Sequence, residues 1–242
     1  MKKIFIENLK TIIYALIIAF IIRSFFFQPF YIPSSSMEPN LLIGDRLFVS
    51  KYTYGYSRHS LPFSPKIYSK RILYSQPERG DIIVFKTPED NRTDFIKRLI
   101  GFPGDTIQII NSDLYLNGIK IKKKVVKNST LINCGKENIE REFYEETLPN
   151  NKKYIAVYRK SGTWENTEKF TVPKDHFFFM GDNRDCSKDS RFLSSVGYVN
   201  KNNIVGKARI VFLSNDKNKG SLFKFWNWHK SIRYERFIKK IN

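Results

Sequence analysis

The sequence predicts a mainly β protein: an antiparallel β domain with a smaller inserted β subdomain, preceded by one N-terminal transmembrane helix. Two observations carry this prediction. An unbroken apolar run lies near the N-terminus, and beyond residue 40 the chain consists of short β-branched and aromatic segments that Gly, Pro, Asn and Asp residues separate. Strands and helices do not alternate along the sequence, which argues against a parallel sheet.

The N-terminal region has the composition of a membrane anchor. The stretch TIIYALIIAFII is followed, after a short polar break, by FFFQPFYIP, so residues 11–32 reach the length of about 20 residues that spans a bilayer. Residues 1–10 carry three lysines, which predicts a short cytoplasmic tail and a single crossing of the membrane. A cleavable secretory signal is the alternative, because the small residues Ser34 and Ser36 imitate a cleavage site, but the bulky aromatic residues before them are unusual neighbours for such a site.

The β segments divide into a main domain and an insertion. Residues 33–119 and 171–213 are assigned to the main β domain, whereas residues 120–170 are more polar and irregular and are predicted to form the inserted subdomain. The segments expected to form strands are RLFVSKYTY, GDIIVFKT, DFIKRLIGF, DTIQII, LYLNGIKI, KYIAVYRK and NIVGKARIVFL.

The charge balance points to an anionic partner. With 42 Lys and Arg against 23 Asp and Glu, the formal net charge is +19, which suits nucleic acid, an anionic membrane surface or an acidic substrate. Because the sequence also predicts a membrane anchor, we expect the anionic partner to be a lipid bilayer and not nucleic acid. Two cysteines, Cys134 and Cys186, lack metal-ligand spacing, so no metal or cofactor is expected. One bridge between them can form in an oxidising compartment.

Residues 214–242 form a basic, aromatic C-terminal tail in which Trp, Phe and Tyr are interleaved with Lys and Arg. Aromatic residues favour the membrane–water boundary, and basic residues are attracted to anionic lipids. A terminal helix docked on the β domain is the alternative interpretation, because the apolar spacing is loosely helical.

Three serines, Ser34 to Ser36 in IPSSSMEPN, directly follow the apolar run. A serine nucleophile needs a base, usually histidine, but the three histidines lie in a polar loop (His59), before an aromatic run (His176) and near the C-terminus (His229), so another residue is expected to activate the serine. In DFIKRLIGF, strand alternation places Lys97 on one face with Phe95 and Leu99. Burial there would lower the lysine pKa and make the amine a candidate base. Spacing alone favours the simpler alternative, a strand lysine that extends its ammonium to water.

Together these segments resemble the bacterial type I signal peptidases, serine proteases with a Ser-Lys dyad. The blocks IPSSSMEPNLLIGDRLFVSKYTYG, RGDIIVF, DFIKRLIGFPGD and FFFMGDNRDCSKDSR occur in the family's order, and the resemblance runs from about Thr11 to Leu213. It implies that Ser36 is the nucleophile and Lys97 the general base of an endopeptidase that removes signal peptides from exported preproteins. It also implies a place in the bacterial cytoplasmic membrane, with the catalytic domain on the outer side.

The resemblance further implies roles for supporting residues. The Ser36 backbone amide and the Ser34 hydroxyl would form an oxyanion hole, Ser187 would orient the Lys97 amine, and Asp189 and Arg191 would form a structural ion pair. Without the resemblance, GDNRDCSKDSR is equally typical of a solvated turn or a calcium-like loop. Two shallow apolar pockets would accept small residues at positions −1 and −3 of the preprotein. Their implied walls, for each of which ordinary core is the alternative, are Phe30, Ile32, Pro33, Met37, Leu41, Val84, Phe95 and Ile96.

Two departures from the family pattern stand near the predicted site. Cys186 occupies a position where asparagine is frequent, which leaves a thiol close to the dyad, and RFLSSVGYVN is longer than the common form and ends in Asn200 instead of proline.

Three other functions would account for part of the sequence. A self-cleaving repressor would carry a helix-turn-helix where this chain has an anchor, and a non-enzymatic membrane-anchored basic binding protein would leave the pairing of Ser36 with Lys97 unexplained. A specialised signal-peptidase-like protease with a narrow substrate range stays open.

Overall fold

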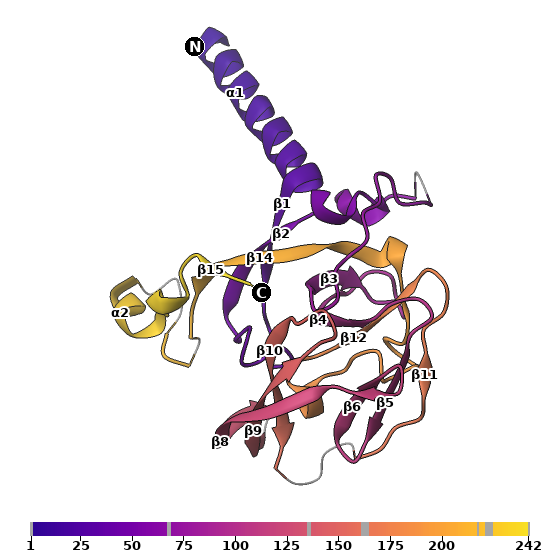
Figure 1. Ribbon diagram of the computed structural model, residues 1–242. Coiled ribbons are helices and arrows are strands. Elements are labelled where there is room, and N and C mark those ends of the chain that lie inside the picture. Colours follow the sequence, from indigo (N-terminus) through magenta and orange to yellow (C-terminus); the bar gives the residue numbers. More distant parts are fainter. Residues whose placement is uncertain are drawn as a thin grey trace.

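The computed structural model describes residues 2–66, 69–134, 137–160, 165–216, 218–220 and 225–241. Within them the fold is mainly β, with antiparallel sheets and one N-terminal apolar helix (Figure 1). The predicted fold class is therefore confirmed.

Helix α1, Lys2–Ile21, projects away from the β domain (Figure 1). A short π-helical turn, Ile22–Phe26, continues it. The candidate span Lys3–Phe26 is 24 residues long, and within it an 18-residue window has a mean hydropathy of 2.0 and no residue buried inside the protein. Because about 20 apolar residues cross a bilayer, this segment has the length and composition of a membrane span.

The end of the predicted anchor is a strand. We expected residues 11–32 to lie in the membrane, but Phe27–Tyr31 form strand β1, which pairs antiparallel with β2, Asp45–Ser50. The helix also begins earlier than expected, at Lys2. Composition placed these boundaries wrongly because aromatic residues suit a sheet as well as a membrane interface.

The main sheet has the strand order β1-β2-β14-β3-β4-β12-β13, and β15 pairs with β14. All of these pairs are antiparallel. The remaining strands of the sheet are β3 Ile82–Lys86, β4 Asp94–Gly101, β12 His176–Met180, β13 Val199–Asn200, β14 Ile204–Ser214 and β15 Lys239–Lys240.

Strand β3 illustrates how the sheet is buried on both faces. Ile82 and Val84 pack into one core cluster, whereas Ile83 and Phe85 pack into a second cluster together with Leu99 of β4. Successive side chains of a strand point to opposite faces, so one apolar run serves both clusters. Burial of each such side chain contributes about 1.5–3 kcal/mol.

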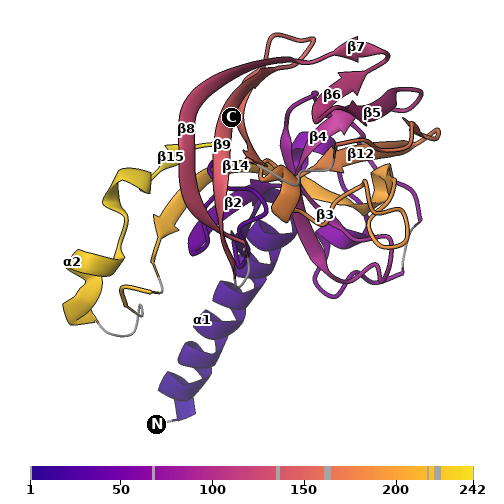
Figure 2. The same ribbon diagram turned by 90° about the horizontal axis from the view of Figure 1, so that it is seen from below.

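A second β region packs against the main sheet. β5 Thr106–Ile110, β6 Asp113–Leu116, β7 Ile119–Lys120 and β11 Phe170–Thr171 form a four-stranded sheet. β8 Lys122–Cys134, β9 Glu137–Thr147 and β10 Lys153–Arg159 form a three-stranded sheet. The hairpin of β8 and β9 is long and strongly curved (Figure 2).

This second region is larger than the insertion that we expected at residues 120–170. Because β5 and β6 join β7 and β11 in one sheet, residues 106–119 belong with the insertion and not with the main sheet. Its core also includes Ile100 of β4 and Phe178 and Met180 of β12. The alternating pattern that identified these strands does not specify which sheet each one joins, so the boundary was wrong.

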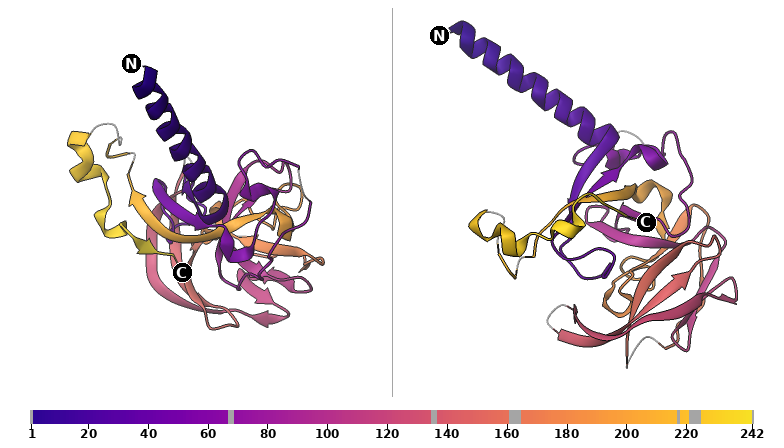
Figure 3. Two further views of the ribbon diagram at one scale, coloured as in Figure 1. Left: turned by 90° about the horizontal axis from the view of Figure 1, so that it is seen from above. Right: turned by 60° about the vertical axis from the view of Figure 1, so that its left-hand side comes forward.

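The C-terminal segment is attached to the main sheet by its last residues. β15 pairs with Ile210 and Val211 of β14, and the buried Arg236 guanidinium donates to Asp45 Oδ1 at 2.9 Å. The short helix α2, Trp228–Ser231, projects beyond the sheet (Figure 3). The tail therefore docks through a strand and an ion pair, whereas the alternative of a docked terminal helix does not describe it.

Candidate active site

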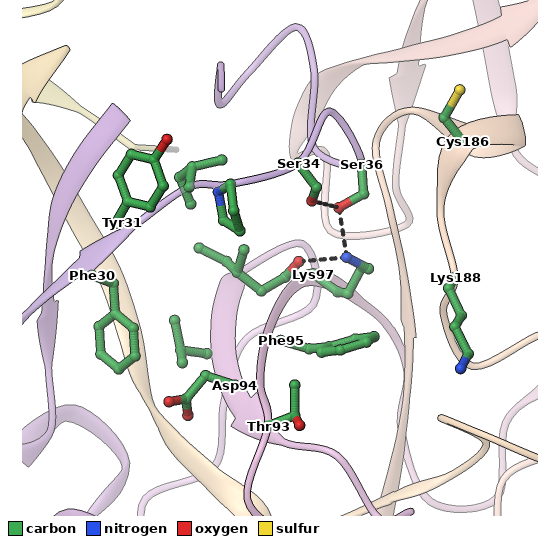
Figure 4. A pocket seen from close by; sticks show the side chains of 14 residues that line it. Phe30, Tyr31, Ser34, Ser36, Thr93, Asp94, Phe95, Lys97, Cys186 and Lys188 are labelled. Atoms are coloured by element: carbon green, nitrogen blue, oxygen red, sulfur yellow. Dashed lines mark hydrogen bonds between the residues drawn. The ribbon is translucent and has the colours of Figure 1, made fainter. Parts of the chain in front are cut away.

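Ser36 and Lys97 lie side by side although they are 61 positions apart in the sequence. Ser36 lies in the loop after β1, and Lys97 lies in β4. Ser36 Oγ and Lys97 Nζ are 2.7 Å apart, and Nζ also donates to the Ile96 carbonyl at 3.0 Å (Figure 4). Both side chains belong to residues that are less than 10% exposed. At this distance an amine can take the proton of a serine hydroxyl.

The surroundings of Lys97 favour its neutral form. Burial lowers the pKa of the amine to about 8, while the carboxylates of Asp189 and Asp182 oppose this shift. The Phe95 ring lies under the amine, 5.2 Å from Nζ. Since the unfolded chain binds this proton more tightly, burial costs about 3 kcal/mol of folding stability below pH 8. That cost disappears as the pH rises from about 8 towards the ordinary lysine value.

Two hydrogen-bond donors lie beside the nucleophile. Ser34 Oγ is 3.4 Å from Ser36 Oγ, and Ser34 is exposed. Within the described part of the chain, the Ser36 backbone N–H donates to no acceptor. Donors left free next to a nucleophile can bind negative charge that develops on a substrate carbonyl.

The loop Gly181–Arg191, called the signature loop below, holds the nucleophile in place. Asn183 donates from its backbone to the Ser36 carbonyl and from its side chain to the Ser35 carbonyl, both at 3.1 Å. A Cβ at Gly181 would lie 2.5 Å from the Ser36 carbonyl oxygen, so the two segments approach closely only with glycine there.

Buried charges fix the signature loop itself. Arg191 donates to both carboxylate oxygens of Asp189, at 2.8 and 2.9 Å, which is the pair that the family resemblance implied. Burial alone would raise the pKa of Asp189, but Arg191 and the hydrogen bonds lower it. Arg184 pairs with Glu146 of β9 at 2.7 Å, with both side chains at most 2% exposed. Charges this deeply buried require such partners.

A cavity of about 440 Å³ opens beside the dyad. Met37 and Leu41, predicted as pocket walls, do not line it; they are fully buried in a core cluster, so this part of the prediction is wrong. The chain turns sharply after Ser36 and carries both side chains inward. The other predicted walls do line the cavity: Phe30, Ile32, Pro33, Val84, Phe95 and Ile96. Residues that were not predicted also line it: Tyr31, Thr93, Asp94, Cys186 and Lys188.

A family model described as signal peptidase, peptidase S26, matches residues 5–213 of this chain. The chain belongs to the signal peptidase family. It is 36% identical over 252 residues to signal peptidase I of Rickettsia typhi, and 37% identical over the same length to that of Rickettsia prowazekii. Both alignments cover 97% of this chain and 93% of the relative. The predicted signal-peptidase function and the serine-peptidase class are therefore confirmed.

A solved structure of a signal peptidase I from Enterococcus faecalis V583 is 27% identical and aligns with a TM-score of 0.33. The alignment covers 55% of this chain and 97% of that chain. A score this low supports no comparison of site geometry.

In this signal peptidase, Ser187 does not contact the base as expected. Its hydroxyl is buried, but it makes no hydrogen bond to Lys97 among the described residues, where Ser36 and the Ile96 carbonyl are the partners of Nζ. Ser187 instead lies against Gly181, because a Cβ at that glycine would meet Ser187 Oγ at 2.2 Å.

Sequence reasoning missed the polar residues that brace the peptidase site. Asp182 accepts from Arg98 Nε and from the Asn40 side chain, both at 2.7 Å, and Asn183 holds the nucleophile loop. One signal was available. Arg98 is next to Lys97 in a strand whose neighbours are apolar, and a charged residue at such a position needs a buried partner.

Cys186 is not a free thiol in this structure. It is joined by a disulfide to Cys134 at the end of β8, with the two Cα atoms 5.7 Å apart. The bridge that the sequence left open is therefore present. Because Cys186 lines the cavity beside Ser36, the disulfide ties the β8–β9 hairpin to a wall of the peptidase pocket. Asn200, the other departure, ends β13 and accepts from the Asn202 backbone at 3.0 Å.

Proposed function

We propose that this signal peptidase cleaves exported preproteins with Ser36 as nucleophile and Lys97 as general base. One observation carries the assignment: Ser36 Oγ lies 2.7 Å from the amine of a buried lysine whose pKa is lowered to about 8. No histidine is among the described residues that line the cavity, and His59, in a different part of the domain, bonds to Ser64. A neutral lysine amine can perform the task that histidine performs in other serine proteases.

In the first half of the reaction, the neutral Lys97 amine takes the Ser36 proton as Oγ attacks the scissile carbonyl. The Ser36 N–H and the Ser34 hydroxyl would stabilise the oxyanion of the tetrahedral intermediate. As the intermediate collapses, the C–N bond breaks and the Lys97 ammonium returns its proton to the leaving amine. The signal peptide is then held as an ester on Ser36.

In the second half, Lys97 takes a proton from a water molecule that attacks this ester, and then returns a proton to Ser36 Oγ. The carboxylates of Asp189 and Asp182 favour the charged amine, so they lower the cost of forming the ammonium in each step. Burial and these carboxylates thus act in opposite directions on the lysine. Their balance sets the pKa near 8, so a usable fraction of the amine is neutral near neutral pH and can still accept a proton.

The proposed preprotein binds as an added strand between two free backbone edges. Phe30–Pro33 and Asp94–Lys97 both line the cavity. β12 pairs with β4 only from Arg98 onward, so within the described part of the chain residues 94–97 have no neighbouring strand on that side. Extended peptides bind such edges through main-chain hydrogen bonds, while side-chain pockets set specificity. Apolar walls close to Ser36 would leave room for small side chains at −1 and −3.

The substrate proposal predicts a strong preference at position −1. A preprotein with alanine at −1 and −3 is expected to be cut at that bond by the full-length enzyme in detergent, and replacement of the −1 alanine by phenylalanine should lower kcat/KM at least about 100-fold. Product mass spectrometry locates the cut. A matched change at −2 is the control. Equal cleavage of the −1 and −2 variants would contradict the pocket assignment, and cleavage of only one among several preproteins would indicate a narrow substrate range.

The base assignment predicts how the rate depends on pH. Since only the neutral amine of Lys97 is active, kcat/KM is expected to rise about tenfold per pH unit up to about pH 8, and to level off above it. Initial rates on a peptide substrate across pH 5 to 10 measure this profile. A variant with His59, His176 and His229 replaced by asparagine should keep the rising limb. Loss of that limb in the triple variant would mean that a histidine is the base.

The family and helix α1 together suggest membrane anchoring. We further propose a single crossing of the bacterial cytoplasmic membrane, with the N-terminus in the cytoplasm and the catalytic domain outside. The basic residues before the apolar core of α1 support this orientation. Protease added to intact spheroplasts should digest the β domain, whereas protection of the domain until lysis would reverse the orientation.

The C-terminal tail is proposed to contact anionic lipid. Trp226 and Trp228 are 59% and 42% exposed, and Tyr234 and Phe237 are also exposed among basic residues. Truncation of the tail would also remove the Arg236–Asp45 ion pair. The test therefore uses the fluorescence of the tryptophan residues in the intact tail. In the full-length Trp164→Phe protein, brominated phosphatidylglycerol in vesicles should quench the fluorescence of Trp226 and Trp228. If the lipid does not quench this fluorescence, the tail does not contact the bilayer and only packs against the β domain.

A further inference from the structure

A second cavity, of about 480 Å³, lies where α1 meets the β domain. It shares Asp94 with the cavity beside Ser36 but no other lining residue. Basic side chains dominate its lining: Arg23, Lys51, Lys86 and Arg92. They come from the end of the anchor, from the residue after β2, and from the end of β3 and the turn that follows it. The peptidase mechanism uses none of them.

The positive charge in this cavity is not balanced. Asp94 is its only lining carboxylate among the described residues, and Lys86 already pairs with it at 2.9 Å. The guanidinium groups of Arg23 and Arg92 have no carboxylate partner in the described part of the chain. Several cations that share one cavity repel each other, and an anion bound among them would relieve that repulsion.

Lys51 is the buried cation of this cavity. It is 1% exposed, and its ammonium donates to the Ser60 carbonyl. Burial and the nearby Arg23 lower the pKa of Lys51 to about 8. His59, on the same wall, has its pKa lowered to about 4 by burial and by Arg58 and Lys86, so it is neutral. A buried cation that faces other cations marks a site prepared for an anion.

The cavity lies at the level of the membrane boundary. Arg23 belongs to the segment Lys3–Phe26 that has the properties of a span. Tyr56, in the loop between β2 and β3, donates from its hydroxyl to the Phe25 carbonyl at 3.0 Å, and the two rings pack edge to face. This loop therefore lies beside the lower end of α1 (Figure 1).

The rim of the cavity is apolar and exposed. Leu61, Pro62 and Phe63 line it, and the Phe63 side chain is fully exposed. The apolar residues at the rim would contact the acyl chains of a phospholipid, and the basic residues inside the cavity would contact its phosphate. A free phosphate ion would contact only the basic residues of the cavity, and the exposed Phe63 would then have no binding partner.

We propose that this cavity binds the headgroup of an anionic phospholipid from the leaflet that contacts the β domain. The site goes beyond the peptidase activity and does not depend on it, since it requires only that α1 lies in a bilayer. The bound lipid fixes the β domain against the membrane surface. Because Asp94 lines both cavities, the lipid site is held at a constant distance from the pocket that receives the preprotein.

The test is photo-crosslinking in nanodiscs. Full-length protein is placed in phosphatidylcholine nanodiscs that contain a small fraction of photoactivatable phosphatidylglycerol, and crosslinked peptides are mapped by mass spectrometry. Crosslinks are expected on the segment Leu61–Ser64. Unlabelled phosphatidylglycerol should compete and extra phosphatidylcholine should not. The variant with Arg23→Gln and Arg92→Gln should lower the yield there about 25-fold, since each basic residue contributes roughly fivefold to attraction by anionic lipid.

A charge-matched control separates a site from general attraction. Lys124→Gln and Lys169→Gln remove two exposed cations beside β8 and β11, on the part of the domain away from α1 (Figure 1). This control should keep the wild-type crosslinking yield, and thermal unfolding in detergent should be alike for all three proteins. Equal losses of crosslinking yield in both double variants would overturn the proposal. Crosslinks distributed over the whole protein surface would overturn it as well. Displacement by inorganic phosphate, but not by chloride at equal ionic strength, would replace the lipid with a free anion.

Discussion

Replacing Ser36 by alanine is expected to abolish preprotein cleavage, and Lys97→Ala should do the same. Each change removes one half of the 2.7 Å Nζ–Oγ contact. Without the hydroxyl no ester can form, and without the amine the hydroxyl loses the base that lies within hydrogen-bond distance of it. Losses in kcat of about 10⁴-fold or more are expected for a nucleophile or its base. Product formation in detergent, followed by quantitative mass spectrometry, covers this range.

The double variant should lose no more activity than either single variant, because the two residues act as one unit. Ser35→Ala is the matched control. Ser35 lies between the two functional serines and is buried, but only its backbone carbonyl is used, as an acceptor for Asn183. Its replacement should leave kcat within about threefold. If Ser36→Ala or Lys97→Ala kept activity close to that of Ser35→Ala, the proposed dyad would be wrong.

The activity of Ser34→Ala should lie between that of Ser35→Ala and that of the two dyad variants. The loss of one oxyanion donor typically lowers kcat by about 10²–10³-fold. The Ser34 hydroxyl is 3.4 Å from Ser36 Oγ and exposed, which places it where a substrate oxygen could meet it. An effect on KM with kcat unchanged would instead indicate that Ser34 only binds the substrate.

The dyad was predictable because its chemistry is local in the sequence. A lysine on an apolar strand face and a serine in a polar turn are each visible within ten residues, and the family blocks then paired them. The expected face of Lys97 is confirmed as well. Ile83, the partner of Lys97 in β3, packs into the same core cluster as Leu99, and Phe95 packs against that cluster, as the alternation of side chains along β4 requires.

The boundaries of the membrane anchor and of the inserted region were less predictable from the sequence than the presence of the strands themselves. Phe27–Tyr31 read as the end of an anchor, and Thr106–Ile110 read as part of the main sheet. In both cases the side chains fit two environments equally well, and the choice depends on which distant strand supplies the backbone hydrogen bonds. For β1 that partner is β2, and for β5 it is β6 together with β11. Alternation fixes the faces of a strand but not its neighbours.

Met37 and Leu41 show a related limit at the site. Apolar residues next to a nucleophile are equally suitable as pocket walls and as core. Here the N–H of Leu41 donates to the Met37 carbonyl at 2.9 Å. This turn draws both side chains into the cluster with Leu47 and Val49. Tertiary packing decided their role.

The buried charge pairs were the least predictable part of the site. Glu146 comes from EREFYEETLPNN, which we interpreted as polar and irregular, and its partner Arg184 is 38 positions away. Polar sequence normally indicates exposure. Only the fold shows that this carboxylate is 1% exposed and accepts hydrogen bonds from Arg184, Tyr154 and Tyr158.

Glu146→Ala is expected to be the most destabilising of the substitutions considered, even though Glu146 does not line the peptidase cavity. It would leave the Arg184 guanidinium buried with no carboxylate partner. Removing one member of a buried ion pair costs about 3–5 kcal/mol in the free energy of unfolding, so the melting temperature should fall by roughly 6–20 °C. Calorimetry of the full-length protein in detergent measures this.

The matched control is Glu140→Ala on the same strand, β9. Its ion pair with Lys160 spans 3.3 Å, but both side chains are 54% exposed, so water screens the charges and the loss should stay below about 1 kcal/mol. If both variants melted at the same temperature, the Glu146–Arg184 pair would not hold the fold together. The difference between them isolates burial, since each change removes one paired glutamate from the same sheet.

Glu146→Ala should also lower kcat at temperatures where the protein is still folded. Arg184 is adjacent to Asn183, the residue that donates two hydrogen bonds to the nucleophile segment, and it donates to the Gly181 carbonyl from Nε at 3.3 Å. An uncompensated guanidinium would move towards solvent and draw this part of the signature loop with it. Ser36 would then lose its fixed position against Lys97, at a cost of about 10²-fold in rate. If kcat stayed at the wild-type value while the melting temperature fell, the pair would support the fold without positioning the nucleophile.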